Sequence, residues 1–367
     1  MLGLAEAAAH RFPDRVQLQL ALARALEGVG QGDEAETCLR SAVATWPGDE
    51  AVAAALAAKL GRDGRFEEAL DCAGPWQDRP WAAKLNLKLL MRQGRYREAE
   101  GFTAAVAAVD PADANLVGLR AARLRDDPEG LLAMCEAALA HRPGVCEALY
   151  WKAIALALLG RSSEASAVMA IESYVQVSRL PVPDGFDGNA PFHAALRDEI
   201  RTNPTIHADP VGHASSHGRR TRTFPMPGDG AASALLVAIR EAISAYADGL
   251  RGDHEFVAAR PESATINAWA LTFGGAGHQL VHHHPEAWLT GVYYVAAEAG
   301  GVAGAIRIGT LPASLGIEPP WPVLELQPVP GTLILFPSFV PHETVPPGEG
   351  KERISIAFDV AAADQAG

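Results

Sequence analysis

One short motif returns at an almost constant spacing through the first half of the chain. In each copy a glycine is followed five residues later by an alanine, at Gly30–Ala35, Gly64–Ala69, Gly94–Ala99 and Gly160–Ala165. Successive alanines lie 34, 30 and 66 residues apart, and a degenerate unit around Ala133 divides the longest interval. Apolar residues before and after the glycines recur with the period of an α-helix. This pattern predicts a stack of helix–turn–helix units in which each unit packs on its neighbours.

The glycine of each motif allows a helix to end in a left-handed conformation, and the small alanine allows the next helix to pack closely on it. The pattern resembles the tetratricopeptide repeat, a helix–turn–helix unit of about 34 residues. We expect four to five units over residues 1–160 and a closing helix over 162–179, which together form an α-helical solenoid domain over 1–180. The resemblance implies a concave face that binds a peptide or protein. Alternatively, the helices only support the second domain or form the contact of a homodimer.

Composition limits the function classes that remain. A chain of 367 residues is long enough for about two domains. Its net charge of −13 argues against nucleic acid as the main partner, because binding a polyanion usually requires a basic surplus. We expect no membrane span, since no run of 18 apolar residues lacks a charge, and we expect no secretory signal. The four cysteines, all in the first half, are typical of helix cores in a reducing, cytoplasmic protein.

The second half of the chain differs in composition and holds 10 of the 12 histidines. Helices are predicted over residues 192–200 and 231–250. The polar stretch between them is interpreted as a solvated loop, with attraction of an acidic substrate by Arg219–Arg222 as the alternative. From residue 265 onward the segments are short, apolar and bounded by Gly or Pro, which is typical of the strands of a barrel or sandwich. We therefore predict a second, β-rich domain over residues 181–367.

A cluster of histidines follows the first of these strands, in the segment His282-His283-His284-Pro285-Glu286. In a β-strand alternate side chains point to the same face, so His282 and His284 would converge while His283 faces away, and Glu286 is a candidate third member. Two imidazoles on one face suit a divalent transition metal. The alternative interpretation is a histidine-rich strand with a solvated face.

Two later features acquire meaning beside this cluster. His342 lies five residues after a predicted strand that ends at Pro337. Further on, Arg353 and Ser355 share one face of a strand whose other face is apolar. An arginine can hold a carboxylate by two parallel hydrogen bonds, and a hydroxyl two residues further adds a third. The strand therefore predicts either a carboxylate site inside a barrel or a polar edge strand.

The order H-x-H, then histidine, then R-x-S resembles the Fe(II)/2-oxoglutarate-dependent oxygenases, whose H-x-D/E…H iron triad lies beside an arginine for the cosubstrate. The likeness is closer to a bacterial and phage branch that has an H-x-H-P segment and a terminal Arg-Ile-Ser-Ile-Ala-Phe strand. The matching segments are His282–Pro285, Thr290–Tyr294, Pro330–Ser338 with His342, Arg353–Phe358, and Asn267 with Trp269. The resemblance covers residues 182–362. It implies a double-stranded β-helix, a jelly-roll or cupin-like fold, with flanking helices.

The resemblance implies an iron site made of His282, His284 and His342. Most of the wider superfamily has Asp or Glu as the second ligand, and three neutral imidazoles would leave more positive charge on the metal. An alternative set of His284, Glu286 and His342 restores a carboxylate ligand. We favour the first set because it follows the H-x-H-P pattern of the closer branch.

The resemblance also implies that Arg353 and Ser355 hold the far carboxylate of 2-oxoglutarate. Asn267 and Tyr294 are candidates for contacts with the cosubstrate or the substrate, with ordinary barrel packing as the alternative. The implied cofactor is Fe(II), with 2-oxoglutarate and O₂ as cosubstrates of a dioxygenase that forms succinate and hydroxylates its substrate.

The two-part layout favours a hydroxylase whose peptide or protein substrate is recruited by the helical repeats. The first alternative is the same chemistry on a small molecule, with the repeats used for assembly. The second is a non-enzymatic scaffold with a degenerate barrel, against which the intact R-x-S argues. A cupin-like metal enzyme without 2-oxoglutarate is a further alternative.

Overall fold

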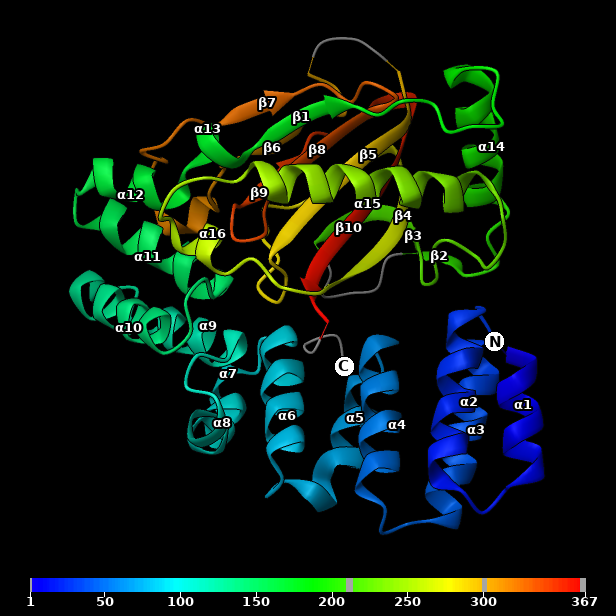
Figure 1. Ribbon diagram of the computed structural model, residues 1–367. Coiled ribbons are helices and arrows are strands. Elements are labelled where there is room, and N and C mark those ends of the chain that lie inside the picture. The colour runs from blue at the N-terminus through cyan, green and yellow to red at the C-terminus, as the bar shows by residue number, and fades with distance from the viewer. Residues whose placement is uncertain (1, 209–213, 299–301, 364–367) are drawn as a thin grey trace. The chain divides into compact units, whose positions relative to one another are not determined.

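The computed structural model describes residues 2–208, 214–298 and 302–363. The chain forms two compact units, divided between Leu119 and Arg120 within a helix (Figure 1). The first unit is helical, and the second contains further helices and the described β-strands. None of the described helices is long and apolar enough to cross a membrane.

The first unit consists of paired helices, coloured blue to cyan in Figure 1. Its helices are α1 (Leu2–Arg11), α2 (Val16–Gly28), α3 (Gly32–Thr45), α4 (Glu50–Arg62), α5 (Phe66–Ala73), α6 (Pro80–Arg92), α7 (Tyr96–Ala99), α8 (Thr103–Val109) and the first part of α9 (Ala114–Arg123), with the 3-10 helices η1 (Gly74–Trp76) and η2 (Glu100–Phe102). The turn glycines Gly30, Gly64 and Gly94 have φ angles of 83°, 78° and 70°, and the alanine five residues after each is fully buried. The predicted tetratricopeptide-like packing is confirmed here.

Four further helices belong to the second unit together with the strands. They are α10 (Pro128–His141), α11 (Cys146–Leu158), α12 (Ser162–Met169) and α13 (Ile171–Tyr174). The expectation of one closing helix over 162–179 is wrong in its later part. Ala170 has a φ of 44° and ends α12, and after α13 the chain forms the strand β1 (Gln176–Arg179). The domain boundary near residue 180 stays a prediction. The compact units divide after Leu119, so that α10–α13 belong to the same unit as the strands.

The strands form one seven-stranded and one three-stranded sheet. The larger sheet has the order β1, β8 (Thr332–Pro337), β5 (Leu289–Ala297), β10 (Gly348–Ala362), β4 (Ala264–Gln279), β3 (Ser215–Thr221) and β2 (Ile206–Ala208). The smaller sheet has the order β7 (Leu324–Leu326), β6 (Ile306–Ile308) and β9 (His342–Thr344), and the 3-10 helix η3 (Ala313–Leu315) lies between β6 and β7 in the chain. The described pairings are all antiparallel. The fold is the double-stranded β-helix, or jelly roll, that the sequence predicts.

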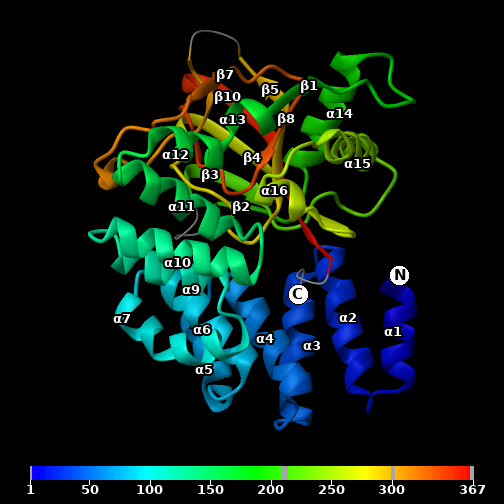
Figure 2. The same cartoon turned by 60° about the vertical axis from the view of Figure 1, so that its left-hand side comes forward.

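The central strand β10 separates an apolar layer from the pocket. Its side chains alternate, and those that face the apolar layer are almost completely buried: Ile354, Ile356, Phe358 and Val360. The predicted flanking helices are α14 (Asn189–Arg201), which contacts β5, and α15 (Ala231–Gly249), which contacts α14. Figure 1 shows α15 crossing the strands of the larger sheet, and Figure 2 shows it nearly end-on. The short helix α16 (Glu255–Ala258) follows.

The polar stretch that the sequence analysis interprets as a solvated loop contains two strands instead. β3 pairs with β4 and β2 pairs with β3, so both extend the larger sheet at its edge. Arg219 and Arg220 lie on β3, which is flanked by β2 and β4, and the Arg219 side chain is exposed to water. The sequence pattern missed these strands because they lack an apolar alternation.

Candidate functional site

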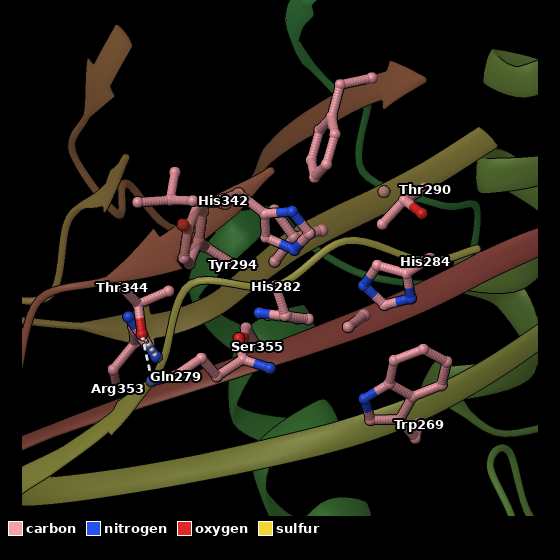
Figure 3. A pocket seen from close by; sticks show the side chains of 15 residues that line it. Trp269, Gln279, His282, His284, Thr290, Tyr294, His342, Thr344, Arg353 and Ser355 are labelled. Atoms are coloured by element: carbon pink, nitrogen blue, oxygen red, sulfur yellow. Dashed lines mark hydrogen bonds between the residues drawn. The ribbon is translucent and has the colours of Figure 1, made fainter. Parts of the chain in front are cut away.

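Three histidines converge in one pocket of the second unit (Figure 3). Each of His282, His284 and His342 offers one ring nitrogen, and these nitrogens lie within 4.8 Å of one another. The ring centroids are separated by 4.3 Å between His282 and His342, by 5.2 Å between His282 and His284, and by 5.3 Å between His284 and His342. In the described part of the chain this is the cluster whose geometry could hold a metal ion.

A local pairing between the segment after β4 and the first residue of β9 brings the histidines together. His282 and His342 form an isolated β-bridge, with backbone N–H to O distances of 3.0 and 2.9 Å. The backbone N–H of His284 donates to the carbonyl of Ser338 at 2.9 Å. The prediction that the H-x-H segment lies within a strand is therefore only partly right. The strand β4 ends at Gln279, and the convergence depends on this pairing as well as on alternation along one strand.

The second ring nitrogen of each histidine faces an acceptor. Nδ1 of His282 lies 2.7 Å from the carbonyl of Leu280, and Nδ1 of His342 lies 3.2 Å from the carbonyl of Val340. Nδ1 of His284 lies 2.9 Å from a carboxylate oxygen of Asp359. Because carbonyls and carboxylates only accept, Nδ1 carries the hydrogen in each ring and Nε2 keeps a free lone pair.

Electrostatics keep at least two of the rings neutral, which is the form that binds metal. Burial, and then the neighbouring imidazole of His284, lower the pKa of His282 to about 3. Burial and the other two imidazoles also hold the pKa of His342 well below its usual value. The donor set of three imidazole nitrogens fits a mid-row divalent metal such as Fe(II). The alternative ligand Glu286 is exposed and lies outside the cluster.

Arg353 lies in the same pocket, as the sequence analysis expects of a residue that binds the cosubstrate. Its side chain is buried, and it donates to the carbonyl of Gly304 and to the hydroxyl of Thr344, both at 3.0 Å. Its guanidinium carbon lies 4.8 Å from the ring centroid of Phe273. Nε has no partner, and no described carboxylate forms an ion pair with this guanidinium. Burial lowers the pKa of Arg353 from its ordinary value.

A buried cation without an anion is costly, so this arrangement favours an anionic ligand. Two further polar groups lie nearby. The Tyr294 hydroxyl is buried without a hydrogen-bond partner, and burial raises its pKa to about 12. Ser355 lines the pocket and is the cross-strand neighbour of Tyr294. The orphaned polar atoms of Arg353 and Tyr294 therefore fit a carboxylate ligand such as 2-oxoglutarate.

Asn267 is placed differently from the other predicted residues. It is exposed and does not line the pocket, and its cross-strand neighbour on β10 is Asp359. Trp269, two residues further, is buried and also forms a wall of the pocket, with its ring 6.1 Å from that of His284. The guanidinium carbon of Arg220 on β3 lies over the Trp269 ring, 4.9 Å from the ring centroid. Asn267 and Trp269 are two residues apart on β4 and therefore lie on the same face of the strand, but only Trp269 lines the pocket.

Asp359 was missed in the sequence analysis. It continues the alternation Arg353, Ser355, Ala357 along the pocket face of β10, and that alternation was the available signal. One carboxylate oxygen contacts His284, and the other accepts from the hydroxyl of Thr290 at 3.0 Å.

The segment between β4 and β5, residues 280–288, carries two of the candidate metal ligands and is called the metal loop below. It also contacts helix α11, which no sequence pattern indicated. Nε2 of His283, between the two candidate ligands, lies 2.6 Å from a carboxylate oxygen of Glu147. The ring of His283 stacks on Tyr150 with centroids 4.1 Å apart and planes inclined by 21°. The Cys146 thiol donates to the carbonyl of Ala287 at 2.7 Å. The residue that points away from the metal is thus held by the last repeat-like helix pair.

Comparison with known families agrees with this geometry. Residues 267–359 match the family model described as "Putative 2OG-Fe(II) oxygenase". These residues are therefore similar to the 2OG-Fe(II) oxygenase family. Residues 16–60 match a tetratricopeptide repeat model. The chain thus combines a segment similar to tetratricopeptide repeats with a segment similar to 2OG-Fe(II) oxygenases, and no curated protein matches it.

Solved structures of both kinds are similar to the chain. A prolyl-4-hydroxylase from Pseudomonas putida is 17% identical, with 53% of this chain and 97% of that chain covered and a TM-score of 0.39. A tetratricopeptide repeat protein from Parabacteroides merdae is 15% identical, with 46% and 70% covered and a TM-score of 0.38. A Trichoplax adhaerens prolyl hydroxylase in complex with a hypoxia inducible factor peptide fragment is 12% identical, with 57% and 94% covered and a TM-score of 0.38.

Proposed function

We propose that this protein is an Fe(II)- and 2-oxoglutarate-dependent dioxygenase that hydroxylates a peptide or protein recruited by its repeats. In the balanced reaction, substrate C–H, 2-oxoglutarate and O₂ give substrate C–OH, succinate and CO₂. One observation carries the proposal: a pocket that holds three convergent imidazoles also holds a buried arginine without an anionic partner. We take His282, His284 and His342 as the ligands.

When bound, Fe(II) would supply the redox chemistry with O₂ and 2-oxoglutarate, and the protein would supply binding and orientation. Arg353 is held by Gly304 and Thr344 with its Nε still unpaired, so it can bind a distal carboxylate without rearranging. The Tyr294 hydroxyl can donate to the same ligand, because its raised pKa keeps it protonated. Trp269 and Phe336 line the pocket and exclude water from it.

The chemistry can be tested without knowing the substrate. Purified protein is loaded anaerobically with Fe(II), and 2-oxoglutarate is added while the visible metal-to-ligand charge-transfer band is recorded. Replacing Arg353 by Gln removes a buried charge partner worth about 2–5 kcal/mol, so the 2-oxoglutarate concentration at half-saturation should rise by at least about 30-fold. The matched control is Arg307→Gln, whose arginine is half exposed and paired with Glu325, and which should not alter the titration.

The outcomes separate the candidates. If iron-loaded wild-type protein shows no charge-transfer band, the oxygenase proposal is wrong. If the band appears but is equally strong in Arg353→Gln, 2-oxoglutarate binds elsewhere, and the role of Arg353 is wrong. A scaffold with a degenerate barrel would give neither the band nor succinate under air.

A second candidate retains the chemistry and acts on a small molecule. It is favoured by the contacts of α11 with the metal loop, which give the end of the repeats a supporting role. The two are distinguished by succinate formation in air with a random-sequence peptide library against a mixture of free amino acids. Stimulation by peptides alone, with one oxygen atom added to a peptide by mass spectrometry, supports the first candidate. Stimulation by free amino acids alone supports the second.

A further inference from the structure

Asp359 occupies a special place on the central strand. It lies on the pocket face of β10, in register with Thr290 of β5 and Asn267 of β4. Both of its carboxylate oxygens are used. Oδ2 lies 2.9 Å from Nδ1 of His284, and Oδ1 accepts from the Thr290 hydroxyl at 3.0 Å. The Thr290 hydroxyl in turn lies 2.8 Å from that of Ser338, whose carbonyl accepts the backbone N–H of His284.

This network holds His284 from two directions. The backbone of His284 is attached to the segment that follows β8, and its ring is attached to β10. A carboxylate accepts and does not donate when ionised, so Asp359 requires the hydrogen on Nδ1 and directs the Nε2 lone pair into the cluster. The other two rings face uncharged backbone carbonyls at this position. Of the three, His284 alone has an anionic partner among the described contacts.

The charge of Asp359 has a chemical consequence. A metal dication bound by three neutral imidazoles has no anionic protein ligand. A carboxylate hydrogen-bonded to a ligand imidazole makes that imidazole a stronger donor and brings a negative charge close to the metal without binding it. With Asp359 present, the dication, the Arg353 cation and the 2-oxoglutarate dianion form a site without net charge, as they would with one carboxylate among the ligands.

Resting on the proposed function, we infer that Asp359 replaces, through His284, the carboxylate that the three-histidine set lacks. It is a positioning residue that sets the tautomer of His284 and compensates the charge of the metal. The negative charge would thus lie beside the ligand His284 instead of on a residue that binds the metal directly. Strand β10 carries both Arg353, for 2-oxoglutarate, and Asp359, for the metal site.

The test measures metal affinity and coordination rather than turnover. Full-length metal-free protein is titrated with Co(II), without 2-oxoglutarate, and the visible absorption of the bound ion is recorded. Asp359→Asn keeps the shape and one acceptor oxygen but removes the charge. Loss of such an outer partner typically weakens metal binding by about 10–100-fold, and we expect this range together with a changed Co(II) spectrum.

Glu286→Gln is the matched control, because it removes one negative charge two residues from His284 at an exposed position outside the histidine cluster. It should leave the Co(II) affinity within about twofold of wild type. If both variants weaken binding equally, the effect is general electrostatics and the inference is wrong. If Asp359→Asn binds Co(II) as wild type does, the inference is also wrong.

Failure of the proposed function looks different. In that case wild-type protein itself binds neither Co(II) nor Fe(II), or binds them without the 2-oxoglutarate band. Should Asp359→Asn not fold, Thr290→Val tests the same network from its other end. It leaves the Asp359–His284 contact in place but frees one carboxylate oxygen, so we expect a smaller loss of Co(II) affinity, and unchanged affinity would contradict the inference.

Discussion

The helices of the first unit and the helices α10–α13 share one sequence period but differ in what they contact. In the first unit the arginines that follow Gly64 and Gly94 pair with the preceding repeat: Arg65 lies 2.6 Å from Glu36, and Arg95 lies 2.7 Å from Glu67. In α11, by contrast, Cys146, Glu147 and Tyr150 contact the metal loop.

The difference teaches that a repeat can be recruited into a catalytic unit without losing its repeat pattern. The turn glycine and the buried alanine are kept at Gly160 and Ala165, with a φ of 71° at the glycine. Packing within a repeat uses only one side of each helix. On α11 the other side carries the residues that contact the metal loop. Substitutions at equivalent places in the two regions should therefore have unequal effects.

The largest loss is expected at one of two turn glycines that have nearly the same backbone conformation. Gly94 has a φ of 70° and an added Cβ would meet no atom within 4 Å, so Gly94→Ala should cost only the left-handed strain of about 1–2 kcal/mol. Gly144 has a φ of 73°, but an added Cβ would lie 2.1 Å from Cβ of Ala259. Gly144→Ala should therefore lose a further 1–3 kcal/mol or so through overpacking. Denaturant unfolding of the two variants measures this; equal losses would refute the contrast.

A somewhat smaller loss than in Gly144→Ala is expected at one of two glutamates. Glu147 is buried and accepts from both His283 and Trp151, at 2.6 and 2.8 Å. Glu147→Ala leaves two partly buried donors without their acceptor and should lower the free energy of unfolding by about 2–4 kcal/mol. Because His283 lies between the two proposed ligands His282 and His284, Co(II) binding should weaken as well. The control Glu98→Ala removes an exposed partner of Arg95 and should change neither quantity, and an unchanged Co(II) affinity in Glu147→Ala would break the proposed coupling.

The smallest effect is expected from the stacked ring of Tyr150. Its centroid lies 4.1 Å from that of His283, and such pairs contribute about 0.5–1.5 kcal/mol beyond buried area. Tyr150→Leu should lower the melting temperature by a few degrees, while Tyr150→Phe keeps the ring and should melt as wild type does. The exposed Tyr96 of the first unit provides the comparison, since Tyr96→Leu should have no effect. A loss in Tyr150→Phe equal to that in Tyr150→Leu would assign the effect to the hydroxyl rather than to the stack.

Much of the fold followed from local patterns. The repeats were predictable because a helical turn and its glycine are set by residues a few positions apart. The strands β5, β8 and β10 and the helices α14 and α15 were predictable from apolar runs or alternation. The strands β2 and β3 were not, because they have no apolar alternation of their own and form through pairing, of β3 with β4 and of β2 with β3.

The candidate site divides in the same way. Motif order and resemblance named the three histidines and Arg353, and the structure gathers them in one pocket. The exclusion of Glu286 from the cluster, the exposure of Asn267 and the wall formed by Trp269 depend on how the strands end and pair, which the motif does not encode.

The sequence by itself determined the two-part composition, the repeat period and the residue types of a metal and carboxylate pocket, because each of these is a pattern over a few neighbouring positions. Only the tertiary structure decided which partners those residues have. The contact of His284 with Asp359 spans 75 residues, and that of His283 with Glu147 spans 136. Contacts over such separations form where strands and helices that are far apart in the sequence pack together, so no local pattern records them.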